Sequence, residues 1–176
     1  MDDDVILTPL RASDGSVRAW AVVSREDADL AELRWQIATD GYAQRNLPRR
    51  PKLPRVHERL HRVILSRIIN RAIGPDEQCD HVNGNRLDNR RCNLRVATHG
   101  QNMANRKAWG LSRYLGVSAH KGKWQALIRQ PAPGTEGRKI YLGLFADEAE
   151  AARAYDRAAR ECHGEYARLN FPDGDS

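Results

Sequence analysis

The first 47 residues alternate between short apolar runs and turn residues. Two β-favouring runs, Val5–Pro9 and Val17–Val23, flank an Asp-Gly turn sequence. Ser24 then precedes Asp27 by three residues, and apolar positions follow at the spacing of a short helix. The pattern predicts a small β-rich subdomain over residues 1–47, with one short helix capped by Ser24.

A basic, proline-rich stretch at residues 48–56 separates this subdomain from the next apolar pattern. Proline removes backbone donors and favours extended chain, so this stretch is predicted to be a linker. Leu60–Ile73 then carries apolar residues at helical spacing and stops at Gly74-Pro75, which predicts a helix with one buried face. We interpret His61, near its start, as a structural residue rather than a ligand.

Residues 112–172 have the pattern of a further unit. Three β-like runs, Tyr114–Ser118, Trp124–Arg129 and Lys139–Phe145, are separated by turn residues. The alanine-rich stretch Asp147–Cys162 then predicts a helix that ends before a glycine suited to a C-terminal cap. Small side chains would let this helix lie close against a three-stranded antiparallel sheet.

Charge is distributed unevenly along the chain, whose formal net charge is +6. Residues 1–47 carry 5 basic and 9 acidic side chains, residues 48–111 carry 14 and 5, and residues 112–176 carry 10 and 9. The basic middle suggests a polyanion-binding surface, although a solvated arginine-rich surface explains the charge equally well. In the last part, residues 112–145 are basic and residues 146–176 are acidic, so the predicted sheet and helix differ in charge.

Composition argues against two other classes of protein. No apolar run approaches the roughly 18 residues needed to cross a bilayer, and the acidic start does not resemble a signal peptide. The three cysteines, Cys79, Cys92 and Cys162, form no CxxC pair. We therefore expect no membrane association, and small buried thiols rather than disulfides or a zinc site.

The segment from Asp80 to Asn102 carries the strongest local signals. Asn83-Gly84 is typical of a tight turn, so a strand is expected to end at Asp80 and His81. Thr98 and the glutamine three residues later form a capping box, which predicts the start of a helix. A strand, a turn, a loop and a helix can together gather an aspartate, a histidine and two asparagines.

This segment resembles the HNH endonucleases, most closely the phage and intron homing type with the pattern DHxNGxxxDNRxxNLRxxTxxxN. The resemblance implies a ββα-metal fold within residues 48–111 that grips one divalent ion. Hard oxygen ligands suit Mg²⁺ or Mn²⁺, and no zinc site is expected. A polar turn followed by a capped helix, with no metal, is the alternative interpretation.

The same resemblance implies roles for individual residues. His81 would be the general base that takes a proton from the attacking water, and Asn93 would hold the loop and orient the ring of His81. Asp80 and Asn102 would bind the metal, which would stabilise charge on the scissile phosphate. Many family members place histidine where Asn102 stands, so His99 is the second choice as ligand.

Residues 112–172 resemble the AP2/ERF DNA-binding domains. The resemblance rests on motifs that include Tyr114-Leu-Gly116-Val117, Tyr141-Leu142-Gly143 and Leu169-Asn170-Phe171-Pro172. It implies that the sheet enters the major groove of DNA while the helix packs behind it, in agreement with the charge segregation.

Several arginines of the plant domains are missing from the first predicted strand, which implies a different target. Trp124 is either a base or sugar contact or the hydrophobic anchor of the sheet. The candidate DNA-contacting residues are His120, Lys121, Lys123, Trp124, Gln125, Arg129, Lys139 and Tyr141.

The sequence thus predicts an α+β chain in three parts: residues 1–47, an HNH unit over 48–111 with its linker at 48–56, and an AP2/ERF-like unit over 112–172. The predicted function is hydrolysis of a phosphodiester bond in double-stranded DNA, at a site selected with help from the last unit. We expect a cytoplasmic location in a bacterial or phage-infected cell and favour a monomer. The alternative is a DNA-binding transcriptional regulator whose nuclease unit is inactive.

Overall fold

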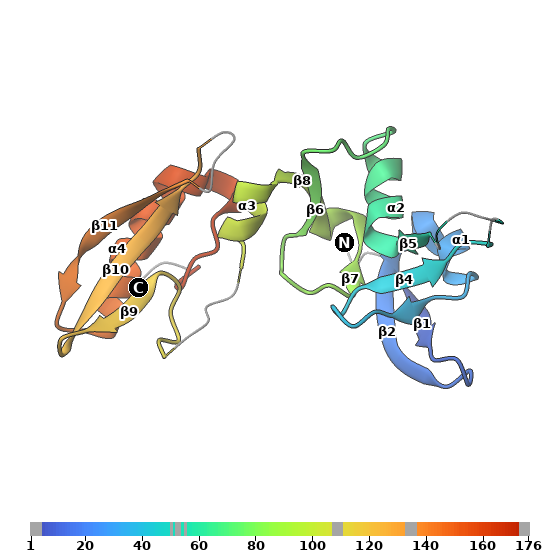
Figure 1. Cartoon of the computed structure of the whole chain (residues 1–176), viewed down its shortest axis with the longest axis horizontal. Helices are drawn as coiled ribbons and strands as arrows, with labels where there is room; N and C mark the ends of the chain where they lie inside the picture. Colours follow the sequence, from blue (N-terminus) through green and yellow to red (C-terminus); the bar gives the residue numbers. More distant parts are fainter. Residues whose placement is uncertain are drawn as a thin grey trace. The chain divides into compact units, whose positions relative to one another are not determined.

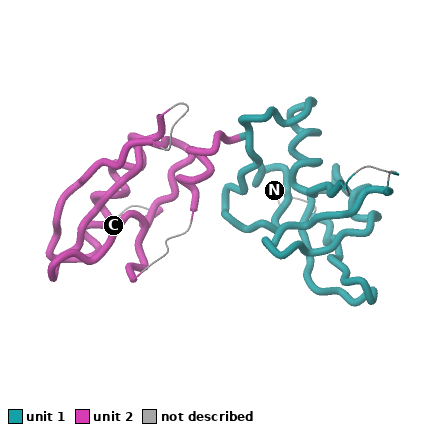
Figure 2. The backbone as a smooth tube through the Cα atoms, in the orientation of Figure 1, with its two compact units in different colours: residues 1–96 teal, residues 97–176 magenta. Residues whose placement is uncertain are grey.

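The computed structural model describes residues 5–49, 51, 54, 56–106, 111–132 and 137–172. The chain divides into two compact units, residues 1–96 and 97–176, which Figure 2 shows in different colours. The sequence patterns predict boundaries after residues 47 and 111, whereas this division falls once, within strand β8 (Leu94–Thr98). Each unit has an apolar core of its own.

The boundary predicted after residue 47 is crossed by a sheet of the first unit. Strands β1 (Val5–Arg11) and β2 (Val17–Ser24) form an antiparallel hairpin, as the apolar pattern predicts. Strand β2 also pairs in parallel with β7 (Asp88–Asn89), so the order of this sheet is β1-β2-β7 (Figure 1). The β-rich start of the chain and the Asp80–Asn102 segment therefore share one sheet.

A second small sheet of this unit leads into its main helix. Strands β3 (Gln36–Ile37), β4 (Ala43–Asn46) and β5 (His57–Arg59) pair in that order, and α2 (Leu60–Ile68) follows directly. The core that these elements share contains fully buried side chains from three parts of the unit: Leu10, Ala21, Val23, Trp35, Leu60 and Ile64. The remaining elements of this unit are η1 (Arg25–Asp27), α1 (Ala28–Ala31), β6 (Glu77–His81), η2 (Arg91–Asn93) and β8, which pairs with β6.

Two local predictions in this unit need correction. Helix α2 ends at Ile68 rather than at Ile73, because Asn70 adopts a left-handed conformation with φ of 51° that a helix cannot continue through. Ser24 precedes η1 but its side chain makes no capping hydrogen bond; its hydroxyl instead accepts one from the backbone N–H of Arg91 at 3.0 Å. A partner distant in sequence thus replaces the predicted local cap.

The cysteines do not share one environment. Cys79 is buried, Cys162 is half-buried and Cys92 is exposed, so the prediction of three buried thiols is right only for the first. Burial raises the pKa of the Cys79 thiol to about 12. Cys79 therefore remains a neutral thiol at physiological pH and acts as a small apolar side chain.

The second unit contains a three-stranded antiparallel sheet backed by a helix, as predicted. Strands β9 (Val117–His120), β10 (Lys123–Gln130) and β11 (Arg138–Phe145) lie in the order β11-β10-β9. Helix α4 (Glu148–His163) covers one face of this sheet (Figure 1). Its buried side chains are mostly alanines, which allow the close approach of helix and sheet: Ala151, Ala152, Ala154, Tyr155, Asp156 and Ala159. The shorter elements of this unit are α3 (His99–Ala104) and η3 (Gly164–Tyr166).

The ends of α4 carry the expected signals. Asp147 accepts a hydrogen bond from the backbone N–H of Glu150 at 3.0 Å, which caps the N-terminus. Gly164 has φ of 52° and ends the helix, as its position predicts. Among the residues that the structure describes, no helix is long and apolar enough to span a membrane.

Candidate functional site

Asp80 lies at the end of β6 and is almost fully buried, with 3% of its surface exposed. Its Oδ2 atom accepts a hydrogen bond from Nε of Arg95 at 2.8 Å and lies 2.8 Å from Nη2 of the same guanidinium in an ion pair. Arg95 belongs to β8, so this ion pair joins the two strands of the sheet. The carboxylate predicted as a metal ligand thus already has a cationic partner.

His81 is the last residue of β6 and is 4% exposed. Its Nε2 atom lies 3.3 Å from Oδ1 of Asn89, and its ring packs edge-on against His61 with centroids 5.3 Å apart. Tyr42 completes this aromatic cluster at 5.8 Å from His81. Burial lowers the pKa of His81, since a charged imidazole is poorly solvated there.

The loop after His81 is held by asparagine side chains. Oδ1 of Asn93 accepts a hydrogen bond from the backbone N–H of Asn83 at 2.9 Å, and its Nδ2 donates to the carbonyl of Asp88 at 2.7 Å. Asn93 therefore holds this loop, while the ring of His81 faces Asn89 instead. The part played by Asn89 was not predicted, although it lies within the DNRxxN motif.

The other predicted metal ligands lie in the second unit. Asn102 is a half-buried residue of α3, and His99 is the exposed first residue of the same helix. The capping box at the start of α3 is formed as predicted, with the hydroxyl of Thr98 accepting from the backbone N–H of Gln101. Within the described ranges, no three His, Cys, Asp or Glu side chains gather where they could hold an ion. A divalent metal on Asp80 and Asn102 stays a prediction, and such an ion would share the Asp80 carboxylate with Arg95, which holds its Oδ2 atom.

The basic middle of the chain has acidic partners in the N-terminal segment. Asp27, which is fully buried, accepts hydrogen bonds from Arg67 at 3.1 Å and from Nε of Arg91 at 2.7 Å. Arg59 likewise donates to Asp40 at 2.8 Å. Much of the charge asymmetry along the sequence is therefore neutralised inside the first unit, and it need not mark a polyanion surface.

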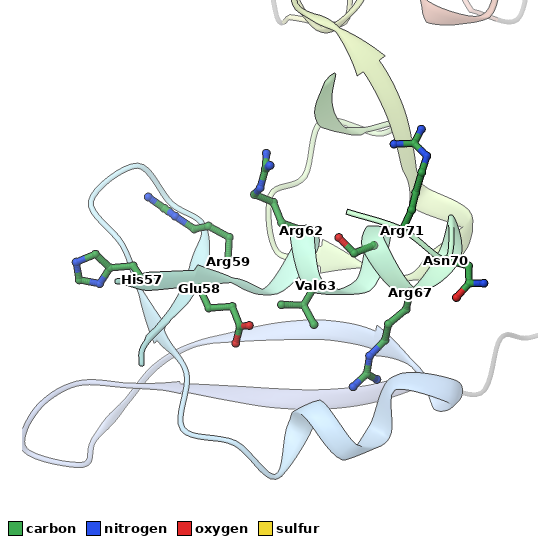
Figure 3. A pocket seen from close by; sticks show the side chains of 9 residues that line it. His57, Glu58, Arg59, Arg62, Val63, Arg67, Asn70 and Arg71 are labelled. Carbon is green, nitrogen blue, oxygen red and sulfur yellow. The ribbon is translucent and has the colours of Figure 1, made fainter. Parts of the chain in front are cut away.

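An open groove of about 630 Å³ runs along the exposed side of α2. Figure 3 shows four arginines around it: Arg59, Arg62, Arg67 and Arg71. Three of these are ion-paired, Arg59 with Asp40, Arg67 with Asp27 and Asp29, and Arg71 with Glu77. This pairing leaves the groove with little net charge, so it is a weak candidate for binding a polyanion.

The buried histidines make the stability of the first unit depend on pH. Burial, and next the neighbouring His81, lower the pKa of His61 from 6.5 to about 3. Between pH 6.5 and about 3 the unfolded chain therefore binds a proton that the folded chain does not, so stability falls as the pH drops through this range. We expect His61 alone to cost about 2 kcal/mol between pH 7 and pH 5.

Urea unfolding at several pH values measures this effect. The variant His61→Phe should show a shallower loss of stability on acidification, whatever its stability at pH 7. His57→Gln, which changes an exposed histidine on β5, serves as the control and should keep the slope of the parent protein. An unchanged slope in His61→Phe would show that other groups cause the acid sensitivity.

The second unit presents a basic sheet face that its helix does not cover. Paired residues of an antiparallel sheet place their side chains on the same face. Ala126 and Ile128 of β10 are buried against α4, so the alternate residues of this strand point away from the helix. We call the uncovered side of the sheet the outer face. From the strand register it consists of Ser118, His120, Lys123, Gln125, Leu127, Arg129, Lys139, Tyr141 and Leu144.

Six of the eight predicted DNA-contacting residues lie on this outer face: His120, Lys123, Gln125, Arg129, Lys139 and Tyr141. Lys121 occupies the turn between β9 and β10 with φ of 47°. Trp124 points to the other side and packs against the core beneath α4, so the structure favours its interpretation as a hydrophobic anchor. The outer face carries no acidic side chain, whereas α4 carries Glu148, Glu150, Asp156 and Glu161.

No family model matches the chain. Its relatives include the dehydration-responsive element-binding protein 2E of Arabidopsis thaliana, 53% identical over 67 residues that span 35% of this chain and 28% of the relative. The putative dehydration-responsive element-binding protein 2H of the same plant is 45% identical over 64 residues, or 36% of this chain and 39% of the relative. The APETALA2-like protein 2 of Oryza sativa subsp. japonica is 52% identical over 66 residues, or 36% of this chain and 14% of the relative.

These relatives are AP2/ERF DNA-binding proteins, which supports the AP2/ERF-like prediction. The aligned stretches are about as long as residues 112–172, and the chain spans well under half of each relative. The comparisons contradict the prediction of an endonuclease, because the relatives are named as DNA-binding factors and not as nucleases. The ion pair of Asp80 with Arg95 and the burial of His81 give these two motif residues a structural role in the first unit.

Proposed function

We propose that the chain is a DNA-binding regulator that attaches to double-stranded DNA through the outer face of β9, β10 and β11. The observation that carries the proposal is the composition of this face, which has four basic or imidazole side chains at its two ends and no acid: His120, Lys123, Arg129 and Lys139. The likeness to AP2/ERF DNA-binding proteins supports the same assignment.

The dimensions of the sheet suit the major groove of DNA. The seven residues from Lys123 to Arg129 span about 20 Å of extended strand. The major groove is about 12 Å wide, so a strand of this length can place its two ends near the phosphates on either side. The basic ends would then hold the DNA backbone, and the middle of the strand would lie over the base edges.

Removing the lysines at the two ends tests this arrangement. We expect the double variant Lys123→Ala/Lys139→Ala to bind every duplex more weakly and to lower the salt slope of binding by about two, because each lysine neutralises about one phosphate. Fluorescence anisotropy of a labelled duplex at several salt concentrations, with the full-length protein, measures both quantities. EDTA should not change either one.

The matched control is Arg157→Ala/Arg160→Ala, which removes the same charge from exposed positions on α4. This variant should keep the salt slope of the parent protein. Equal losses in the two double variants would mean that overall charge, rather than the outer face, governs binding. DNA incubated with the protein and Mg²⁺ should stay intact, and a nick that His81→Ala abolished would contradict a purely regulatory function.

A further inference from the structure

The outer face is arranged in rows that differ in chemistry. The strand register pairs Lys123 with His120 at one end and Arg129 with Lys139 at the other. Between these basic rows lie two neutral rows, which are Ser118–Gln125–Leu144 and Leu127–Tyr141. The part of the sheet that would face the base edges is therefore uncharged.

Apolar side chains are unusually prominent in the neutral rows. Tyr141 is 55% exposed and Leu144 is 44% exposed, although both belong to the well-formed strand β11. Leu127 lies beside Tyr141 on the neighbouring strand and is half-buried. A face that binds DNA gains nothing from leucines that reach the solvent unless the groove offers them an apolar group.

The major groove offers one such group, the C5-methyl of thymine. Guanine is read chiefly by arginine or lysine, and in this sheet these residues occupy the end rows rather than the middle. Gln125, at the centre of β10, carries the side chain type that bonds both N6 and N7 of adenine. Among the described residues, the side-chain amide of Gln125 has no hydrogen-bond partner, so it can bond to a base.

We infer that the middle rows of the outer face select A·T base pairs, with Gln125 reading adenine and with Leu127 and Leu144 contacting thymine methyl groups. This inference rests on the proposed function, since it specifies which bases the same face prefers. Tyr141 packs beside Leu127 and extends the apolar row. The basic end rows contribute affinity for phosphate, and the middle rows contribute the choice of sequence.

Chemical substitution in the DNA tests the inference without changing the protein. The full-length protein is first used to select its preferred duplex from a randomised pool, and the selected core should be rich in A·T pairs. Replacing thymine by uracil then removes the methyl groups and leaves the base pairing unchanged. We expect affinity to fall about fourfold for each methyl group that a leucine contacts.

Two variants connect this effect to particular side chains. Leu127→Ala/Leu144→Ala should bind the thymine and uracil duplexes equally well. Gln125→Ala should become insensitive to 7-deazaadenine, which lacks the N7 acceptor and should weaken the parent protein by at least about fivefold. Both variants should keep the parent salt slope, because the end rows remain.

The possible failures are distinguishable. A protein that bound no duplex at low salt would overturn the proposed function itself. A selected core rich in G·C pairs would overturn the inference and leave the proposed function standing. If the parent protein bound the uracil and 7-deazaadenine duplexes as tightly as the unmodified duplex, the inference would also be overturned and the proposed function would stand.

Discussion

The substitution Gly116→Ala is expected to destabilise the second unit by about 3–5 kcal/mol. A Cβ atom at this position would lie 1.9 Å from Cδ2 of Tyr155 and 2.6 Å from the carbonyl oxygen of Leu127. Gly116 also has φ of 69°, which costs an alanine about 1–2 kcal/mol. Overpacking against a buried ring and a strand backbone adds about 1–3 kcal/mol or more. Because domains are stable by about 5–15 kcal/mol, the loss approaches global unfolding of the unit.

Gly122→Ala is the matched control for this prediction. Gly122 has φ of 75° in the turn between β9 and β10, but no atom lies within 4 Å of a Cβ built there. It should therefore show only the conformational cost of about 1–2 kcal/mol. Amide hydrogen exchange in β10 and α4 measures both losses. Equal losses would show that the contact with Tyr155 contributes nothing, and that Tyr155 can move aside.

The substitution Gly116→Ala should also weaken the proposed DNA binding, because Gly116 lies where the chain enters the sheet. Leu127, which we propose to contact DNA, donates its backbone N–H to the carbonyl of Gly116 at 2.8 Å. Tyr155 on α4 packs against the same point from the other side, and its pKa is raised chiefly by burial. The glycine thus allows the helix to hold the sheet in the register that places the outer-face side chains.

Most local signals in the sequence predicted local structure correctly, with the cap at Ser24 as an exception. The capping box at Thr98 and the glycine after α4 each occur where their spacing indicates. The Asn83-Gly84 turn also forms, with the N–H of Gly84 donating to the carbonyl of His81. These signals involve residues within four positions of one another, so their partners can be read from the sequence alone.

Long-range partners could not be predicted in the same way. The pairing of β2 with β7 joins residues more than sixty positions apart, and no periodicity specifies it. The charge counts showed an acidic start and a basic middle, but not that Asp27 and Asp40 would neutralise particular arginines. For the same reason the spacing of Asp80 and His81 in a motif did not reveal that Arg95 would bind the carboxylate.

The largest effect expected in the first unit comes from Asp27→Ala. The Asp27 side chain is fully buried and joins η1 to α2 and η2 through Arg67 and Arg91. Removing one partner from a buried ion pair costs about 3–5 kcal/mol. Here the two arginines left behind are 36% and 34% exposed and can be rehydrated, so the loss should lie near the lower end of that range. We expect this loss in urea unfolding of the full chain, and Asp27→Asn should lose somewhat less because its amide oxygen can still accept a hydrogen bond.

Asp29→Ala is the control, because Asp29 binds the same Arg67 at 2.7 Å but is 60% exposed. The comparison shows how much of the stability contributed by Asp27 depends on its burial. Solvent screens such a pair, so its removal should cost less than about 1 kcal/mol, and the loss should diminish further at high salt. Arg67 is itself partly exposed and can be rehydrated, so the cost of Asp27→Ala depends mainly on the empty site between α2 and η2. If the two alanine variants were equally stable, water could replace the Asp27 carboxylate at no cost in stability. The ion pairs of Asp27 with Arg67 and Arg91 would then contribute no more than the exposed pair of Asp29.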